Sequence, residues 1–90
     1  MNNDISNLKN ITVLYVEDEK DLREVTSSIL QSFTKNQYIA TNGQEGYDLF
    51  LKHDSDIDLI ISDINMPILN GLEMIKKIKD INKNVPIIVT

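Results

Sequence analysis

The chain has 90 residues, 41% of them hydrophobic, which fits one small globular domain with a single core. Nine basic residues against fourteen acidic ones give a net charge of −5 and a pI near 4.6, which argues against direct binding of nucleic acid. The absence of cysteine excludes a disulfide framework and a thiolate metal site. Residues 1–10 form a polar leader without a signal-peptide core, and no apolar stretch of about 20 residues follows, so we expect a soluble, cytoplasmic chain with no membrane partner.

The first half of the chain alternates strand and helix patterns. Residues 11–16 are nearly all apolar or β-branched and predict a strand covered on both faces. From Glu19 to about Phe33, apolar residues recur at helical spacing and acidic residues occupy the first turn, where the helix dipole favours them. Residues 38–41 predict a short second strand, and the apolar side chains between residues 47 and 51 predict a short second helix.

The second half continues the alternation. Residues 57–62 predict a third buried strand, followed by a turn that contains Met66-Pro67. We expect Asn70-Gly71 to provide a left-handed position before a third helix. The apolar face of that helix contains Leu72, Ile75 and Ile78, and its solvated face contains Lys76, Lys77 and Lys79. Residues 85–90 predict a fourth strand, so the element order is βαβαβαβ.

Strands that alternate with helices predict a parallel α/β sheet with right-handed crossovers. Ligands of such sheets bind beyond the carboxyl ends of the strands, where Glu17, Asp18, Asp63 and Thr90 are expected to converge. Two carboxylates 4 Å apart repel by about 4 kcal/mol at an effective dielectric near 20, so three together favour a bound cation. An all-oxygen site suits Mg²⁺, and an aspartate can itself accept a phosphoryl group as an acyl phosphate.

Three segments carry a resemblance to the receiver domains of bacterial two-component response regulators. They are Val16-Glu17-Asp18-Glu19, then Ser62-Asp63-Ile64-Asn65-Met66-Pro67 with Asn70-Gly71, and finally Pro86-Ile87-Ile88-Val89-Thr90. The resemblance spans residues 11–90 and implies a CheY-like, flavodoxin-like doubly wound fold with strand order 2-1-3-4.

The resemblance also implies roles for individual residues. Asp63 is the expected acceptor of a phosphoryl group from a sensor histidine kinase or a phosphotransfer protein. Mg²⁺ is expected on Asp18, on Asp63 and on the backbone carbonyl of Asn65, with Glu17 assisting through water. Thr90 is expected to turn its hydroxyl toward the phosphoryl group as a switch. The domain is then a phosphoacceptor rather than an enzyme in the usual sense.

The chain departs from the family pattern at two places. Glu17 stands where aspartate is more usual, which lengthens the side chain and keeps its charge. Receivers also continue past the strand-end threonine through a helix, a fifth strand with a phosphate-pairing lysine and a last helix, so residues 11–90 correspond to a partial receiver with impaired phosphotransfer. We expect the strand at 85–90 to be an exposed apolar edge, with Val85, Ile87, Ile88 and Val89 uncovered, and to join two copies in a homodimer.

Two other functions remain open at this point. A Mg²⁺-dependent phosphatase of the haloacid-dehalogenase type also uses an aspartyl phosphate, but its Asp-x-Asp follows the first strand. A pseudo-receiver keeps the fold as an interaction module and has lost phosphorylation, against which the acidic pair and Thr90 argue. The acidic residues as plain turn residues, and Thr90 as an ordinary strand residue, are the simplest alternatives. His53 is interpreted as a solvated helix-end residue, since no second histidine or cysteine stands near it as a ligand. The Asp54-Asp56-Asp58 alternation is interpreted as a solvated loop rather than a calcium site, since the glycine and the distal glutamate of a calcium loop are absent.

Overall fold

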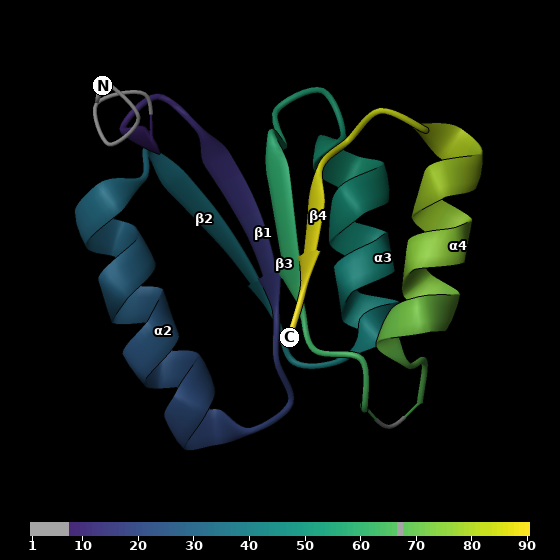
Figure 1. The fold of residues 1–90 in the computed structure, drawn as a ribbon, viewed down its shortest axis with the longest axis horizontal. Coiled ribbons are helices and arrows are strands. Elements are labelled where there is room, and N and C mark those ends of the chain that lie inside the picture. The colour runs from purple at the N-terminus through teal and green to yellow at the C-terminus, as the bar shows by residue number, and fades with distance from the viewer. Residues whose placement is uncertain (1–7, 67) are drawn as a thin grey trace.

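The computed structural model describes residues 8–66 and 68–90. Three helices and four strands alternate along these residues (Figure 1). The elements in chain order are β1 (Thr12–Val16), α2 (Lys20–Phe33), β2 (Asn36–Ala40), α3 (Gly43–His53), β3 (Leu59–Ser62), α4 (Gly71–Ile81) and β4 (Ile87–Val89). The predicted order of elements is confirmed. Within residues 8–66 and 68–90, no helix combines the length and the apolar character needed to cross a membrane.

The four strands form one parallel sheet in the order β2-β1-β3-β4, which confirms the predicted fold class and strand order. Because all strands run in the same direction, their carboxyl ends meet at one edge, toward which the arrows of Figure 1 point. The pairing register places Val16 opposite Ala40 on one side and Ser62 on the other. The residues that follow β1 and β3 therefore leave the sheet side by side.

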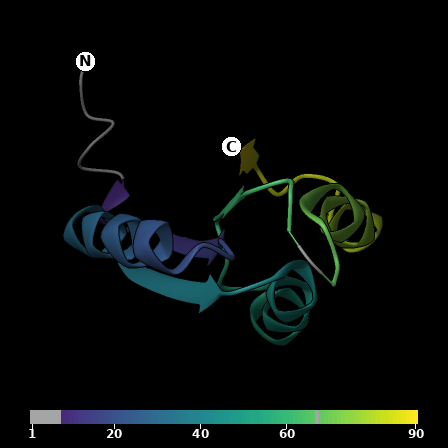
Figure 2. The same cartoon turned by 90° about the horizontal axis from the view of Figure 1, so that it is seen from below.

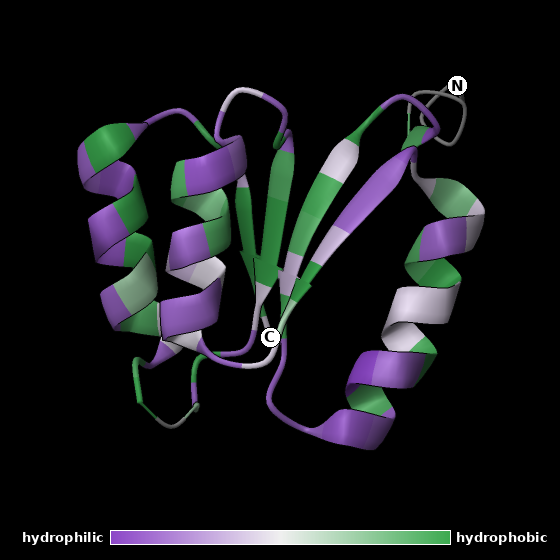
Figure 3. Cartoon of the chain, turned by 180° about the vertical axis from the view of Figure 1, so that it is seen from behind, coloured by the Kyte–Doolittle hydropathy of each residue, from purple (hydrophilic) through white to green (hydrophobic). Residues whose placement is uncertain are grey.

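The helices cover the two faces of the sheet unequally. Helices α3 and α4 pack together on one face and α2 lies alone on the other (Figure 2). Strand β1 is buried along its whole length, as predicted for a central parallel strand. Figure 3 shows strands β1, β3 and β4 as mainly apolar and the start of β2 as polar, between helices whose surfaces alternate between polar and apolar residues.

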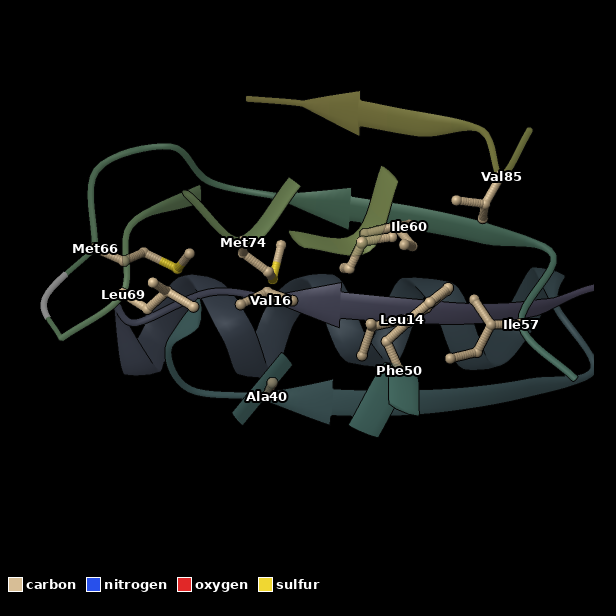
Figure 4. Close-up of a cluster of buried hydrophobic side chains, with 11 residues drawn as sticks. Leu14, Val16, Ala40, Phe50, Ile57, Ile60, Met66, Leu69, Met74 and Val85 are labelled. Atoms are coloured by element: carbon tan, nitrogen blue, oxygen red, sulfur yellow. The ribbon is translucent and has the colours of Figure 1, made fainter. Parts of the chain in front are cut away.

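The hydrophobic core lies between the sheet and helices α3 and α4 (Figure 4). Leu14 and Val16 of β1 point to this face, where Phe50 of α3 and Met74 of α4 meet them. All four side chains are completely buried. Further members of the core are Ala40, Ile57, Ile60, Met66, Leu69, Ile78 and Val85.

The turn before α4 differs from its prediction. Asn70 has an extended backbone (φ −74°, ψ 168°) and caps α4, because its side-chain oxygen accepts the N–H of Glu73 while the Glu73 carboxylate accepts the N–H of Asn70. The left-handed residue is Ile68 (φ 71°), so the prediction for Asn70-Gly71 was wrong. Pro67, part of the predicted turn, lies outside the described residues, as do residues 1–7 of the polar leader.

The face of α4 that packs on the core also differs from its prediction. Its buried residues are Gly71, Met74 and Ile78, whereas Leu72 is exposed. Lys79 is half-buried rather than fully solvated, since its Nζ donates to the backbone oxygens of Lys83 and Val85 at 3.1 and 2.8 Å. The hydrophobic periodicity predicted the helix correctly, but the residue that faces the core is Met74 and not Leu72.

The fourth strand is shorter than predicted and less exposed at its start. Val85 is buried in the core and Ile87 packs against it, so the prediction that these two side chains are uncovered was wrong. Ile88 and Val89 are 50% and 41% exposed, as expected for a strand at the end of the sheet.

Strand β2 begins at Asn36, two residues before the predicted start, because pairing with β1 extends back to Thr12.

Candidate functional site

Three carboxylates meet at the carboxyl edge of the sheet. One side-chain oxygen from each of Glu17, Asp18 and Asp63 lies within 4.8 Å of the corresponding oxygen of the other two. Glu17 and Asp18 follow β1, and Asp63 follows β3. The structure thus brings together the acidic residues that the sequence placed at this edge.

Backbone hydrogen bonds hold the two strand ends against each other. The Asp63 N–H donates to the carbonyl of Val16 at 3.2 Å, and the Glu17 N–H donates to the carbonyl of Ala40 at 3.0 Å. The hydroxyl of Ser62, which is fully buried, donates to the carbonyl of Asp63 at 2.8 Å. The parallel ladder therefore continues one residue past each strand and sets the spacing of the carboxylates.

Gly71 fixes the loop that follows Asp63. Its N–H donates to the carbonyl of Ile64 at 2.8 Å. A Cβ at this position would collide with the carbonyl oxygen of Asp63 and would lie 2.8 Å from the Cα of Ile64. Glycine is required here because the start of α4 touches the backbone of the acidic loop directly. The Asn70-Gly71 pattern predicted a turn at Gly71 but not this contact.

Glu17 is the buried member of the cluster. It is 2% exposed, whereas Asp63 is half-buried and Asp18 is exposed. Burial raises the pKa of the Glu17 carboxyl, and the negative charges of Asp63 and Asp18 raise it further, against a hydrogen bond from the Glu19 N–H that lowers it. The charged form of the Glu17 carboxyl is therefore disfavoured, first by its burial and then by the two neighbouring carboxylates.

The donor set fits a hard divalent cation. Carboxylate oxygens from two neighbouring loops are the ligands that Mg²⁺ prefers, and Mg²⁺ keeps several waters rather than a complete protein cage. One buried carboxyl and two more accessible ones leave part of the cluster open to solvent. A cation at this position would offset the repulsion that raises the pKa of Glu17.

Asn65 and Thr90 lie next to the cluster. The Asn65 N–H donates to Oδ1 of Asp63 at 3.3 Å, so Asn65 closes a tight turn around the Asp63 side chain. The Thr90 N–H donates to the carbonyl of Ser62 at 2.9 Å, which places Thr90 beside the residue before Asp63. Both residues are exposed.

Arg23 is a neighbour of the site that the sequence analysis did not identify. Its Nη1 donates to the carbonyls of Glu17 and Asp18 at 3.0 and 3.3 Å. Tyr15 is also close: burial raises the pKa of its hydroxyl, and so do the charges of Glu17 and Asp63, while a hydrogen bond with Thr26 of α2 lowers it. The sequence offered one signal for this contact: Arg23 comes five residues after Asp18, within the first turn of α2.

The response regulator receiver domain family matches residues 13–90. Response regulator SaeR from Staphylococcus epidermidis is 34% identical over 76 residues, which are 84% of this chain and 32% of that protein. Autoinducer 1 sensor kinase/phosphatase LuxN from Vibrio harveyi is 31% identical over 77 residues, which are 86% of this chain and 9% of that protein. The chain thus spans a third or less of these two relatives.

Solved structures give the same result. The N-terminal domain of an uncharacterized protein from Wolinella succinogenes has a TM-score of 0.82 and 40% identity, over 88% of this chain and 62% of that one. The CheX–CheY–BeF3–Mg²⁺ complex from Borrelia burgdorferi matches with a TM-score of 0.82 and 26% identity, over 88% of this chain and 60% of that one. The chain belongs to the receiver domain family of two-component response regulators.

Proposed function

We propose that this receiver domain accepts a phosphoryl group on the side chain of Asp63, from the phosphohistidine of a sensor histidine kinase or of a phosphotransfer protein. The observation that carries the proposal is the cluster of Glu17, Asp18 and Asp63 at the carboxyl edge of the sheet. Family membership supports a role in two-component signalling. The role of each residue is part of the proposal.

The transfer replaces one bond to phosphorus by another. A carboxylate oxygen of Asp63 forms a bond to phosphorus as the bond from phosphorus to the donor imidazole nitrogen breaks. The electron pair of the broken bond stays on the donor nitrogen. The ring leaves as neutral imidazole when its other nitrogen already carries a proton, and otherwise the nitrogen that held phosphorus takes a proton from water. Asp63 is half-buried, so one side of its carboxylate is accessible to an approaching donor.

The chain's own residues supply the setting for this transfer. Glu17, Asp18 and Asp63, with the backbone carbonyl of Asn65, would hold Mg²⁺, whose chemistry there is to neutralise negative charge on oxygen. The hydrogen bond from the Asn65 N–H orients the Asp63 carboxylate. Thr90, whose N–H donates to the carbonyl of Ser62, is the proposed switch, which would turn its hydroxyl toward the phosphoryl group.

The chain's partners follow from this chemistry. A phosphohistidine-bearing protein is the proposed donor, and the acidic balance of the chain argues against nucleic acid as a direct partner. The proposed compartment is the cytoplasm, which agrees with the absence of cysteine.

The test is incubation of the chain with phosphoramidate, a small donor with a nitrogen–phosphorus bond, in the presence and absence of Mg²⁺. The proposal predicts one protein-bound phosphate that requires Mg²⁺, with no turnover of p-nitrophenyl phosphate. Turnover of that phosphomonoester would instead identify a phosphatase. Mg²⁺ binding without any bound phosphate after prolonged incubation would favour the pseudo-receiver.

A further inference from the structure

Arg23 connects helix α2 to the backbone that carries two of the three acidic residues. It is half-buried, and a single guanidinium nitrogen, Nη1, donates to the carbonyls of Glu17 and Asp18. The distances are 3.0 and 3.3 Å. Charge-assisted hydrogen bonds of this kind are about twice as strong as neutral ones.

The loop at residues 17–19 is otherwise tied to the same helix through its side chains. The Glu19 carboxylate caps α2 by accepting the N–H groups of Asp21 and Leu22 at 3.0 and 2.7 Å. Glu17 Oε2 accepts the Glu19 N–H at 3.2 Å. Helix α2 therefore holds this loop in two ways: Arg23 donates to the carbonyls of Glu17 and Asp18, and the Glu19 carboxylate accepts amides of the first helical turn.

Arg23 does not occupy the carboxylates of Glu17 and Asp18. Its hydrogen bonds go to carbonyl oxygens, so the side-chain oxygens of Glu17 and Asp18 keep their lone pairs for a cation. At the same time the guanidinium adds a positive charge next to a proposed cation site. These two effects act on cation affinity with opposite signs, because a fixed loop strengthens binding and a nearby positive charge weakens it.

We propose that Arg23 is a positioning residue for the divalent cation: it holds the backbone of Glu17 and Asp18 so that their carboxylates face Asp63. The inference rests on the proposed function, since it concerns the same site. We expect the gain in cation affinity from the fixed loop to exceed the loss from charge repulsion, because the guanidinium is hydrogen-bonded to the backbone of both residues that carry the ligands. Removing a group that orients metal ligands typically lowers metal affinity by about 10- to 100-fold.

The experiment compares Mg²⁺ affinity in four forms of the chain by calorimetric titration: wild type, Arg23→Ala, Arg23→Lys and Lys20→Ala. Lys20 is the matched control, because it is an exposed cation in the first turn of the same helix. We expect Arg23→Ala to weaken Mg²⁺ binding about tenfold or more. Arg23→Lys keeps the charge, but its Nζ lies one bond closer to the backbone than Nη1 and cannot reach both carbonyls in the same way, so it should also weaken binding. Lys20→Ala should leave affinity unchanged or slightly raise it.

A repulsive role would give the opposite sign. If Arg23→Ala binds Mg²⁺ as tightly as the wild type or more tightly, the positioning role is overturned. If Arg23→Ala unfolds, the comparison of Arg23→Lys with the wild type decides in the same way. Thermal unfolding of each variant without Mg²⁺ identifies that case.

Amide hydrogen exchange of the metal-free chain separates this inference from the proposed function. Loss of the Arg23 contacts should speed exchange of the Glu19 N–H, which is bonded to Glu17, whereas Lys20→Ala should not. A wild type that binds no Mg²⁺ contradicts the metal in the proposed function, and Arg23 is then judged by exchange alone. Unchanged Glu19 exchange in folded Arg23→Ala would refute the positioning role.

Discussion

The two faces of the sheet are covered in different ways, although the same strands supply both. Toward α3 and α4, alternate residues of β1 pack against completely buried side chains such as Phe50 and Met74. Toward α2 no residue of the helix itself is fully buried, and the residues turned to the sheet are Arg23, Thr26, Ser27 and Leu30. Of the apolar residues of α2, only Leu30 is half-buried, whereas Leu22, Val25, Ile29 and Phe33 are exposed.

The two faces contribute differently: one mainly stabilises the fold, and the other positions the loop that carries Glu17 and Asp18. The α3/α4 face buries apolar area, which is the main source of folding free energy. The α2 face carries a polar contact that reaches the acidic edge, from Arg23 to the carbonyls of Glu17 and Asp18 in the loop after β1. Substitutions on the two faces should therefore have different consequences.

The largest effect is expected for Phe50→Ala. Phe50 is completely buried on α3, and truncation of a buried phenylalanine costs about 3–5 kcal/mol. Phe33→Ala on α2 is the matched control, because Phe33 is 44% exposed and should lose less than about 1 kcal/mol. Urea unfolding of both variants measures the difference. Equal losses would show that α2 is as well packed as α3.

Gly71→Ala tests whether the α3/α4 face also positions Asp63. The added Cβ meets the Asp63 carbonyl, and we expect a loss of about 2 kcal/mol together with shifted amide resonances at Asp63 and Ile64. Leu72→Ala is the control at the next residue, since its side chain is exposed. A Gly71→Ala chain with wild-type stability and unchanged Asp63 resonances would contradict the close contact.

The acidic edge should make metal-free stability depend on pH. Because the pKa of Glu17 is raised in the folded chain, the folded state binds more protons than the unfolded state above the usual glutamate value of about 4.5. The free energy of unfolding should therefore fall as pH rises from that value through the raised pKa. Denaturant unfolding across this range should show a smaller decline in Glu17→Gln, and in the wild type with Mg²⁺. A wild-type profile identical to that of Glu17→Gln would contradict the assignment.

The smallest effect is expected at the open edge of the sheet. Ile88 and Val89 are exposed on β4, whose outer side has no neighbouring strand among the described residues, so we expect weak homodimerisation through residues 85–90. Light scattering at high micromolar concentration should give a dimeric mass that Ile88→Glu returns to that of a monomer. Leu51→Glu, at an equally exposed site on α3, should not change the mass. A monomeric wild type would refute the dimer.

Most of the fold follows from the pattern of apolar residues. The continuous apolar runs predict β1 and β3. Because the carboxyl ends of parallel strands share an edge, these two strands also predict that Glu17, Asp18 and Asp63 lie together. The hydrophobic periodicity predicted helix α2 but not how far its apolar face is exposed. Spacing shows which residues share a face, but it does not show whether another element covers that face. Val85 was misjudged for the same reason.

Other features of the site depend on contacts between segments distant in sequence. Gly71 is needed because of the backbone of Asp63, and Arg23 matters because of two carbonyls rather than any acidic side chain. Neither contact has a periodic signature. Asn70 and Glu73 do have a local one, the capping box, which a left-handed interpretation of Asn70-Gly71 overlooked.

The most direct test of the proposed function is to locate the phosphate on the chain. Wild type, Asp63→Asn and Asp56→Asn are treated with phosphoramidate and Mg²⁺, then analysed by intact mass and by peptide mapping after borohydride reduction of the acyl phosphate. Asp56 is an exposed carboxylate before β3, at the opposite end of that strand from Asp63. We expect one phosphate on Asp63 in the wild type and in Asp56→Asn, and none in Asp63→Asn. A phosphate that persists in Asp63→Asn, or that maps to another residue, would contradict the account.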